Sequence, residues 1–283
     1  MSLFDTHIAV DWSGGNDRGA RPKKDAIWVG VAGEAPRYFR NRQCVEAWLM
    51  DRLTTELAAQ RRVLAGFDFA FGYPSGFARH LTGSDDPLAV WRALNRRIED
   101  SPSVNNRFDV AASINATLPG IGPFWGNALR RDIDDLPRLG RARSHMPFEE
   151  KRVVERAAHG AFSVWQLAGA GAVGSQVLMG LPVLERLREA FCDRCAVWPF
   201  QPLDRQFAFV EIWPSLWNAE VSRRARPGSI KDAIQVDVVA QSLASLDQCD
   251  RLEGLLSEGY QAPEEGWILG AGHDDLSTAQ VAS

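Results

Sequence analysis

Three short apolar runs open the chain and are separated by turn-forming residues. The first, 7–14, carries Asp11 and ends in a glycine turn; the second covers 26–33 and the third 37–40. Short apolar runs bounded by glycine, proline and polar residues are typical of buried β-strands. The sequence therefore predicts three strands, with the polar segment 14–25 as a hairpin loop between the first two.

A helix and a fourth strand follow. Between 44 and 61 the apolar positions recur at the spacing of an amphipathic helix. These positions are Val45, Trp48, Leu49, Leu53 and Leu57. The next apolar run, 63–72, contains Asp68 and closes at Tyr73 and Pro74. The predicted order is thus β-β-β-α-β.

The pattern changes between 75 and 200, where helical stretches alternate with long irregular segments. Strand character returns at 206–214. The last long helix is expected over 229–246, with Ser229 as its N-cap and Asp232 in its first turn, where both residue types are favourable.

Composition supports one sizeable hydrophobic core. The chain has 283 residues, of which 45% are apolar, and this is enough to bury a full core. We therefore expect an α/β fold in which residues 1–283 form a single domain, interrupted by a large and mostly helical insertion at 75–200.

The net charge limits the classes of partner. Lys and Arg number 32 against 36 Asp and Glu, a formal charge of −4. This balance excludes a protein that grips nucleic acid through bulk positive charge, because such affinity depends on Lys and Arg neutralising phosphates. No apolar run approaches the roughly 20 residues of a membrane span, and the first residues lack a signal-peptide pattern. We expect a cytoplasmic protein without a membrane partner; the sequence leaves its oligomeric state open.

Two aspartates stand in apolar strands and need a partner. Asp11 and Asp68 each end or interrupt such a run, and a buried carboxylate is costly unless a cation, a metal or hydrogen-bond donors satisfy it. Each could simply cap the glycine turn that follows it. If the two strands are parallel neighbours, however, their ends bring the carboxylates together, an arrangement that suits Mg²⁺ with waters and substrate phosphate oxygens.

Later carboxylates could complete such a site. Glu211 lies near the end of the strand predicted at 206–214, and Asp232 and Asp237 lie on the last long helix. Five residues advance a helix by about 500°, so these two aspartates point roughly 140° apart, and Asp232 is the better candidate. Together with the strand aspartates they would allow two metals about 3.5–4 Å apart, which promote phosphodiester cleavage. Lys231 could neutralise the substrate.

These features resemble the ribonuclease-H-like superfamily, whose plan is three strands, a helix and a fourth strand, with an acidic residue on the first strand. More closely, four segments look like an uncharacterised bacterial family of predicted nucleases with this fold. Some relatives in that family carry a label linking them to molybdopterin guanine dinucleotide synthesis. The segments are Asp11-Trp-Ser-Gly, Phe67-Asp68-Phe-Ala-Phe-Gly-Tyr-Pro74, Glu211-Ile-Trp-Pro-Ser215 and Lys231-Asp-Ala-Ile-Gln-Val236.

The resemblance implies a nuclease activity and a set of metal ligands. In that superfamily the metals are bound by the first-strand aspartate, a fourth-strand carboxylate and one on the closing helix, positions held here by Asp11, Asp68 and Asp232. Neither glutamate of the predicted first helix stands in a recognisable motif. Glu211 either supplies a fourth ligand or hydrogen-bonds a loop. The match covers about the first 75 residues and 205–245, which leaves the insertion outside the common core.

A glycine-rich segment leaves a rival hypothesis open. Residues 169–174 fit G-x-G-x-x-G, a dinucleotide fingerprint when a strand precedes it, a helix follows and an acidic residue comes about 20 positions later. A helix is predicted, Asp193 stands near that distance and 163–167 could be the strand; a tight turn before a helix would also explain the glycines. Actin-like kinases and ATPases share the ribonuclease-H-like core, so an ATP-dependent phosphotransferase or ATPase of that type is the alternative.

Candidates for contacting the substrate lie in three loops. Arg141 and Arg143 belong to an arginine-rich segment, and arginine offers a bidentate fork to phosphate. Ser13 lies in the turn after the first strand, and Phe124 and Trp125 stand in a Gly/Pro loop, where an exposed ring could stack on a base.

Cysteine spacing adds little. Cys192 and Cys195 form a single C-x-x-C pair, but a zinc site needs four ligands and no second pair is present. We expect plain structural thiols at these positions.

The leading hypothesis is a metal-dependent phosphodiester hydrolase of the nuclease type. It would use Mg²⁺ or Mn²⁺ on a nucleic-acid or nucleotide substrate, with Asp11, Asp68 and Asp232 as ligands and Glu211 in support. A binding protein that kept the fold without catalysis is a third hypothesis.

Overall fold

The computed structural model describes residues 2–17, 19, 21–158, 160–261, 263–273 and 276. The chain forms two compact units. Unit 1 consists of residues 1–69, 187–263 and 267–283, and unit 2 consists of residues 70–186 and 264–266. Unit 1 contains every strand of the sheet, whereas unit 2 is built from helices and loops.

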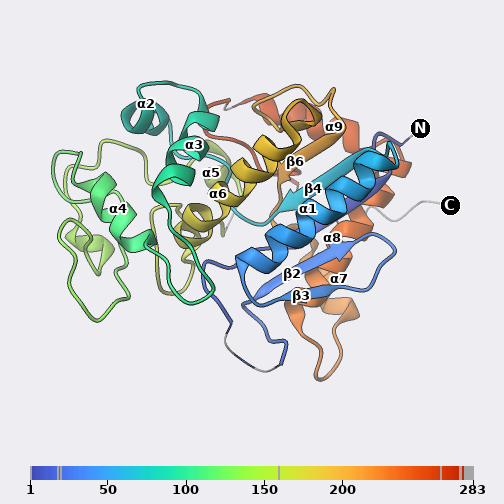
Figure 1. Cartoon of the computed structure of the whole chain (residues 1–283), viewed down its shortest axis with the longest axis horizontal. Coiled ribbons are helices and arrows are strands. Elements are labelled where there is room, and N and C mark those ends of the chain that lie inside the picture. Colours follow the sequence, from blue (N-terminus) through green and yellow to red (C-terminus); the bar gives the residue numbers. More distant parts are fainter. Residues whose placement is uncertain are drawn as a thin grey trace. The chain divides into compact units, whose positions relative to one another are not determined.

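The sheet of unit 1 has six strands in the order β3-β2-β1-β4-β6-β5. The strands are β1 Thr6–Asp11, β2 Ile27–Val31, β3 Arg37–Phe39, β4 Val63–Phe67, β5 Cys195–Val197 and β6 Phe207–Glu211. β1 to β3 pair in antiparallel fashion, whereas β4, β6 and β5 run parallel to β1 (Figure 1). This mixed sheet with its helices confirms the expected α/β class.

Helices cover both faces of this sheet. α1, Arg42–Ala58, contacts one face, where the Thr6 hydroxyl donates to Glu56 at 3.1 Å. α8, Lys231–Gln248, contacts the other face, where the His7 Nε2 lies 2.9 Å from a carboxylate oxygen of Asp247. Because neighbouring strand residues point to opposite faces, successive positions of β1 meet different helices.

The direction of α8 is the feature that positions the site. Asp247, near the helix end, lies beside the start of β1 through His7, while Asp232, in the first turn, accepts a hydrogen bond from the Asp25 amide at 2.6 Å. Asp25 comes just before β2, whose residue Trp28 pairs with Asp11. α8 therefore runs antiparallel to β1 and begins where β1 ends.

The remaining helices belong mostly to unit 2. Unit 1 also holds α7 Asn218–Arg224, α9 Leu252–Ser257 and the 3₁₀ helices Cys192–Arg194, Pro214–Trp217 and Glu258–Gln261. In unit 2 lie α2 Phe77–Thr82, α3 Pro87–Arg97, α4 Arg107–Asn115, α5 Val153–Ala157, the 3₁₀ helix Gly140–Ala142 and most of α6 Val173–Phe191. No helix in the described part of the chain is both long and apolar enough to cross a membrane.

Aromatic rings fill the core of unit 2. Phe124 is fully buried and its ring centre lies 5.1 Å from that of Trp165, with Tyr73 and Phe77 packed around them. The expectation that Phe124 is exposed for base stacking is therefore wrong, because this loop folds its ring inward.

Three further local expectations were wrong. Ser229 is not the N-cap of α8: Ile230 holds that position, and the Ser229 hydroxyl instead donates to the Arg226 carbonyl at 2.6 Å within the preceding turn. The strand that residues 163–167 could have formed is absent, and Gln166 makes only an isolated bridge to Trp125. β4 ends at Phe67 instead of continuing to residue 72.

Candidate functional site

Asp11 is the last residue of β1, and Asp68 directly follows β4, the neighbouring parallel strand of unit 1. The register pairs Val10 with Phe67, and the Asp68 amide donates to the Val10 carbonyl at 2.9 Å. The two aspartates are thus the next pair in register, on strands about 4.8 Å apart. Both side chains are partly exposed, and within the described residues neither carboxylate has a hydrogen-bond or ion-pair partner.

Asp232 brings a third carboxylate to the same end of the sheet. It lies in the first turn of α8 and is nearly buried. The backbone amide of Asp25 donates a hydrogen bond to one of its oxygens. The negative charge of Asp232 also acts on the Asp11 carboxylate. The helix that closes unit 1 therefore presents its carboxylate to the strand ends, as the sequence hypothesis requires.

Glu211 lies at the end of β6, on the far side of β4 from Asp11. It pairs in register with Phe67, and its carbonyl accepts the Leu269 amide at 2.9 Å. Its side chain is buried, and its negative charge acts on Asp68. Four carboxylates, carried by β1, β6, α8 and the residue after β4, thus lie at the same end of unit 1, where their charges act on one another.

Burial and mutual repulsion raise the proton affinity of the three aspartates. Burial, followed by the charges of Asp68 and Asp232, raises the pKa of Asp11 well above its ordinary value. Burial and the charge of Glu211 raise the pKa of Asp68 to about 7. Burial also raises the pKa of Asp232. Like charges held together in this way favour either a proton or a bound cation.

Lys231 is the basic residue nearest to these aspartates on α8. It is exposed, and its positive charge offsets part of the rise in the pKa of Asp11 and Asp232. Ser13 is held elsewhere: its hydroxyl faces the Asp25 carbonyl at 3.3 Å and accepts the Gly15 amide at 3.2 Å. Of these two candidates, Lys231 has the freer side chain to meet a substrate.

Asp237 does not join the cluster. One of its oxygens lies 3.2 Å from the Arg224 guanidinium, and the other accepts the Gln241 amide at 2.7 Å. Glu56 of α1 is likewise engaged: it is buried and binds Arg52, Arg61 and the hydroxyl of Thr6 at the start of β1. Both carboxylates therefore have structural partners of their own.

The two candidate arginines belong to unit 2. Arg143 lies 2.9 Å from a Glu150 oxygen and stacks over the Trp125 ring at 5.6 Å. Arg141 is exposed in the 3₁₀ helix Gly140–Ala142 and has no described partner. Arg143 thus has a structural role in its own unit, while the Arg141 guanidinium faces solvent.

The glycine-rich segment is a turn that opens α6. Gly169 and Gly171 have φ of 95° and 78°, values that favour glycine, and a Cβ at Gly174 would lie 2.4 Å from the Val164 carbonyl oxygen. The helix follows, but the strand that a dinucleotide fingerprint needs is not formed at 163–167. The tight-turn explanation accounts for these glycines.

Only one of the four cysteines is buried. Cys195 starts β5 inside the core, whereas Cys192, Cys44 and Cys249 are exposed, and none of the four forms a disulfide bond. The C-x-x-C pair therefore spans a 3₁₀ turn and a strand, and only Cys195 is packed in the core.

The donor set fits a hard cation with an incomplete protein shell. Across the residues that the structure describes, no three His, Cys, Asp or Glu side chains are gathered as a ready metal cage. Mg²⁺ usually takes only one or two protein carboxylates and keeps several waters. Asp11 and Asp68, side by side and without other donors, match that requirement, with Asp232 beside them.

The sequence analysis did not predict a role for two residues near the cluster. Asp25 comes just before β2, so the antiparallel pairing of β1 and β2 places it beside the end of β1; this topology was the signal that could have found it. Arg42 is fully buried and donates to the carbonyls of Ser13 and Gly15, at 3.0 and 2.8 Å. It braces the loop after Asp11, and nothing in its own sequence context indicates that role.

The fold and the site define an α/β protein with a carboxylate cluster at the ends of its parallel strands. Comparisons of the chain with protein-family models, with curated proteins and with solved structures give no match. Function therefore rests on the geometry alone.

Proposed function

We propose that this protein has a ribonuclease-H-like core and is a Mg²⁺- or Mn²⁺-dependent phosphodiester hydrolase acting on nucleic acid or nucleotides. The observation that carries the proposal is the in-register placement of Asp11 and Asp68 at the ends of adjacent parallel strands, with Asp232 at the start of the antiparallel α8. The succession of three antiparallel strands, a helix and a strand parallel to the first supports the same plan.

Each residue has a chemical task in this proposal. Asp11 and Asp68 hold the cation, and Asp232 lies beside them with one oxygen already fixed by the Asp25 amide. A divalent cation at such a site polarises a phosphate oxygen and activates water. Lys231 binds the phosphate charge, and Glu211 keeps the Asp68 end of the cluster negative so that a cation is preferred.

Replacement of the strand-end carboxylates is the direct test. Asp11→Asn and Asp68→Asn should each lower Mn²⁺-dependent cleavage of a DNA, RNA and nucleotide panel by at least about a hundredfold, because even outer partners of metal ligands cost 10–100-fold. Both variants should also lose Mn²⁺ binding in calorimetry. Asp51→Asn is the matched control, since Asp51 is exposed on α1 and has no described side-chain partner.

Three outcomes separate the hypotheses. Cleavage by the natural protein that disappears in both variants and persists in the control supports the hydrolase. No cleavage across the panel, with Mn²⁺ still bound, contradicts it and favours a binding protein. Saturable ATP binding with phosphate transfer favours the actin-like phosphotransferase instead.

A further inference from the structure

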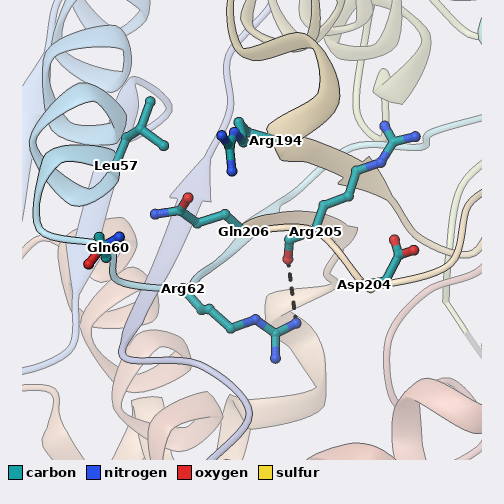
Figure 2. A pocket seen from close by; sticks show the side chains of 7 residues that line it. All are labelled: Leu57, Gln60, Arg62, Arg194, Asp204, Arg205 and Gln206. Atoms are coloured by element: carbon teal, nitrogen blue, oxygen red, sulfur yellow. Dashed lines mark hydrogen bonds between the residues drawn. The ribbon is translucent and has the colours of Figure 1, made fainter.

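A second polar site lies at the opposite end of the parallel strands in unit 1. A pocket of about 400 Å³ is lined by the residues that precede these strands and by the end of α1. Its lining residues are Leu57, Gln60, Arg62, Arg194, Asp204, Arg205 and Gln206 (Figure 2). Since β4 is five residues long, about 16 Å of strand separates it from the carboxylate end.

The pocket carries more positive than negative charge. Three arginines and one aspartate line it, and arginine stays protonated in proteins. Arg62 donates to the carbonyls of Leu3 and Leu203, at 2.8 and 2.9 Å. Arg205 donates to the Cys195 carbonyl at 2.6 Å. Carbonyls fix these guanidinium groups without cancelling their charge.

Arg194 is the arginine that is left to meet a ligand. It ends the 3₁₀ helix Cys192–Arg194, it is exposed, and no hydrogen bond or ion pair engages its side chain in the described part of the chain. Figure 2 shows its guanidinium directed toward the Gln206 side chain, whereas the Arg62 and Arg205 guanidinium groups point away from one another. The Gln206 amide donates to the Arg61 carbonyl at 3.1 Å, which leaves it a second N–H.

We propose that this pocket binds the phosphate group of a small phosphorylated ligand. Arg194 offers the bidentate fork that matches phosphate oxygens, the amides of Gln60 and Gln206 add neutral donors, and Arg62 and Arg205 keep the surroundings positive. The pocket volume lies in the range of small-molecule sites. Leu57 is the one apolar side chain in the lining, so the ligand is polar throughout.

Titration with inorganic phosphate in metal-free buffer at constant ionic strength tests the proposal. Calorimetry and amide NMR should show saturable millimolar binding, with shifts at the side chains of Gln60 and Gln206. Arg194→Gln should weaken binding about tenfold, or roughly 1.4 kcal/mol. Asp204→Asn should strengthen it, because that change removes the carboxylate that lines the pocket. A gain of affinity is not a result that structural damage produces.

The control and the second probe make the test decisive. Arg97→Gln changes an exposed arginine of α3, in unit 2, which has no described side-chain partner, and should bind phosphate like the natural protein. A sugar phosphate should bind at least as tightly as inorganic phosphate.

The proposal is wrong if phosphate does not saturate, if chloride at equal ionic strength competes equally well, or if Arg97→Gln loses as much affinity as Arg194→Gln. Binding of a single-stranded oligonucleotide alone, with the same dependence on Arg194, would overturn the small ligand in favour of a nucleic-acid backbone. Because the buffer is metal-free throughout, none of these outcomes depends on the proposed hydrolase activity.

Discussion

At the scale of single residues, the carboxylates at the two ends of β1 differ in their hydrogen bonding. Asp247 meets the start of β1 and accepts the amides of Leu3 and Phe4 as well as facing the ring of His7. Asp11, at the other end, has no such donors among the described residues. A carboxylate that accepts several donors is satisfied within the fold, whereas one without donors is available for an external cation.

The buried His7 should give the protein a measurable pH dependence. Burial lowers the pKa of His7 below its ordinary value of 6.5, against the opposing effect of Asp247 and Asp5. In the unfolded chain His7 takes up a proton near its ordinary pKa while the folded protein still excludes it. The free energy of unfolding should therefore fall as the pH drops from 7 through 6.5 toward the lowered pKa.

A variant isolates this contribution. His7→Gln keeps a donor toward Asp247 but does not titrate, so urea unfolding between pH 7 and 5 should show less loss of stability than in the natural protein. Asp11 and Asp68, whose pKa values are raised, act with the opposite sign, since their protonation in the folded state stabilises it at lower pH. They are present in both proteins and cancel in the comparison. Parallel pH curves for the two proteins would contradict the prediction.

At the scale of elements, hydrophobic pattern located five of the six strands and the three longest helices, and it missed β5 and several short helices. β5 has only three residues, follows a 3₁₀ helix directly, and forms because it pairs with β6. The start of α8 moved to Lys231 because the turn before it binds the Ser229 hydroxyl. Local propensity is a weak prior that tertiary contacts override.

The packing of α8 on the sheet should be sensitive to one glycine. A Cβ at Gly30 of β2 would lie 2.2 Å from the Val236 carbonyl oxygen of α8, so Gly30→Ala must push the helix off the strand. We expect the variant to lose about 2–4 kcal/mol of stability in urea unfolding, a range typical of severe packing defects.

The matched control is Gly254→Ala in α9. Its new Cβ would meet nothing within 4 Å, and alanine favours helix by about 0.5–1 kcal/mol over glycine. This variant should therefore be as stable as the natural protein or more so. Equal stability of both variants would show that α8 does not pack on Gly30 as described.

At the scale of the whole molecule, the net charge of −4 acquires a local cause. Four carboxylates lie at one end of unit 1, while the pocket at the other end of its strands has an excess of arginine. The small net charge therefore includes contributions from two regions of opposite sign. The acidic region suits a cation, and the basic region suits a phosphate group.

Global stability should report the repulsion at the carboxylate end. In EDTA, Asp11→Asn should raise the melting temperature, because it removes a carboxylate that the negative charges of Asp68 and Asp232 repel. Each kcal/mol of added stability raises the melting temperature by about 2–4 °C in a chain of this size. At a concentration 100 times the Kd, Mn²⁺ should stabilise the natural protein by roughly 2.7 kcal/mol and so raise its melting temperature. The melting temperature of Asp11→Asn should not change with Mn²⁺. Equal effects of Mn²⁺ on both proteins would mean that the ion binds elsewhere.

The sequence by itself determined the class of fold, the order of the first elements and the identity of the unusual aspartates. These depend on local pattern: short apolar runs make strands, and a charged residue inside one stands out. Only the tertiary structure decided that Asp11 and Asp68 end neighbouring parallel strands, that α8 returns with Asp232 to the same end, and that arginines collect at the other. Strand order and helix direction arise from contacts between residues far apart in the chain, and no local pattern encodes them.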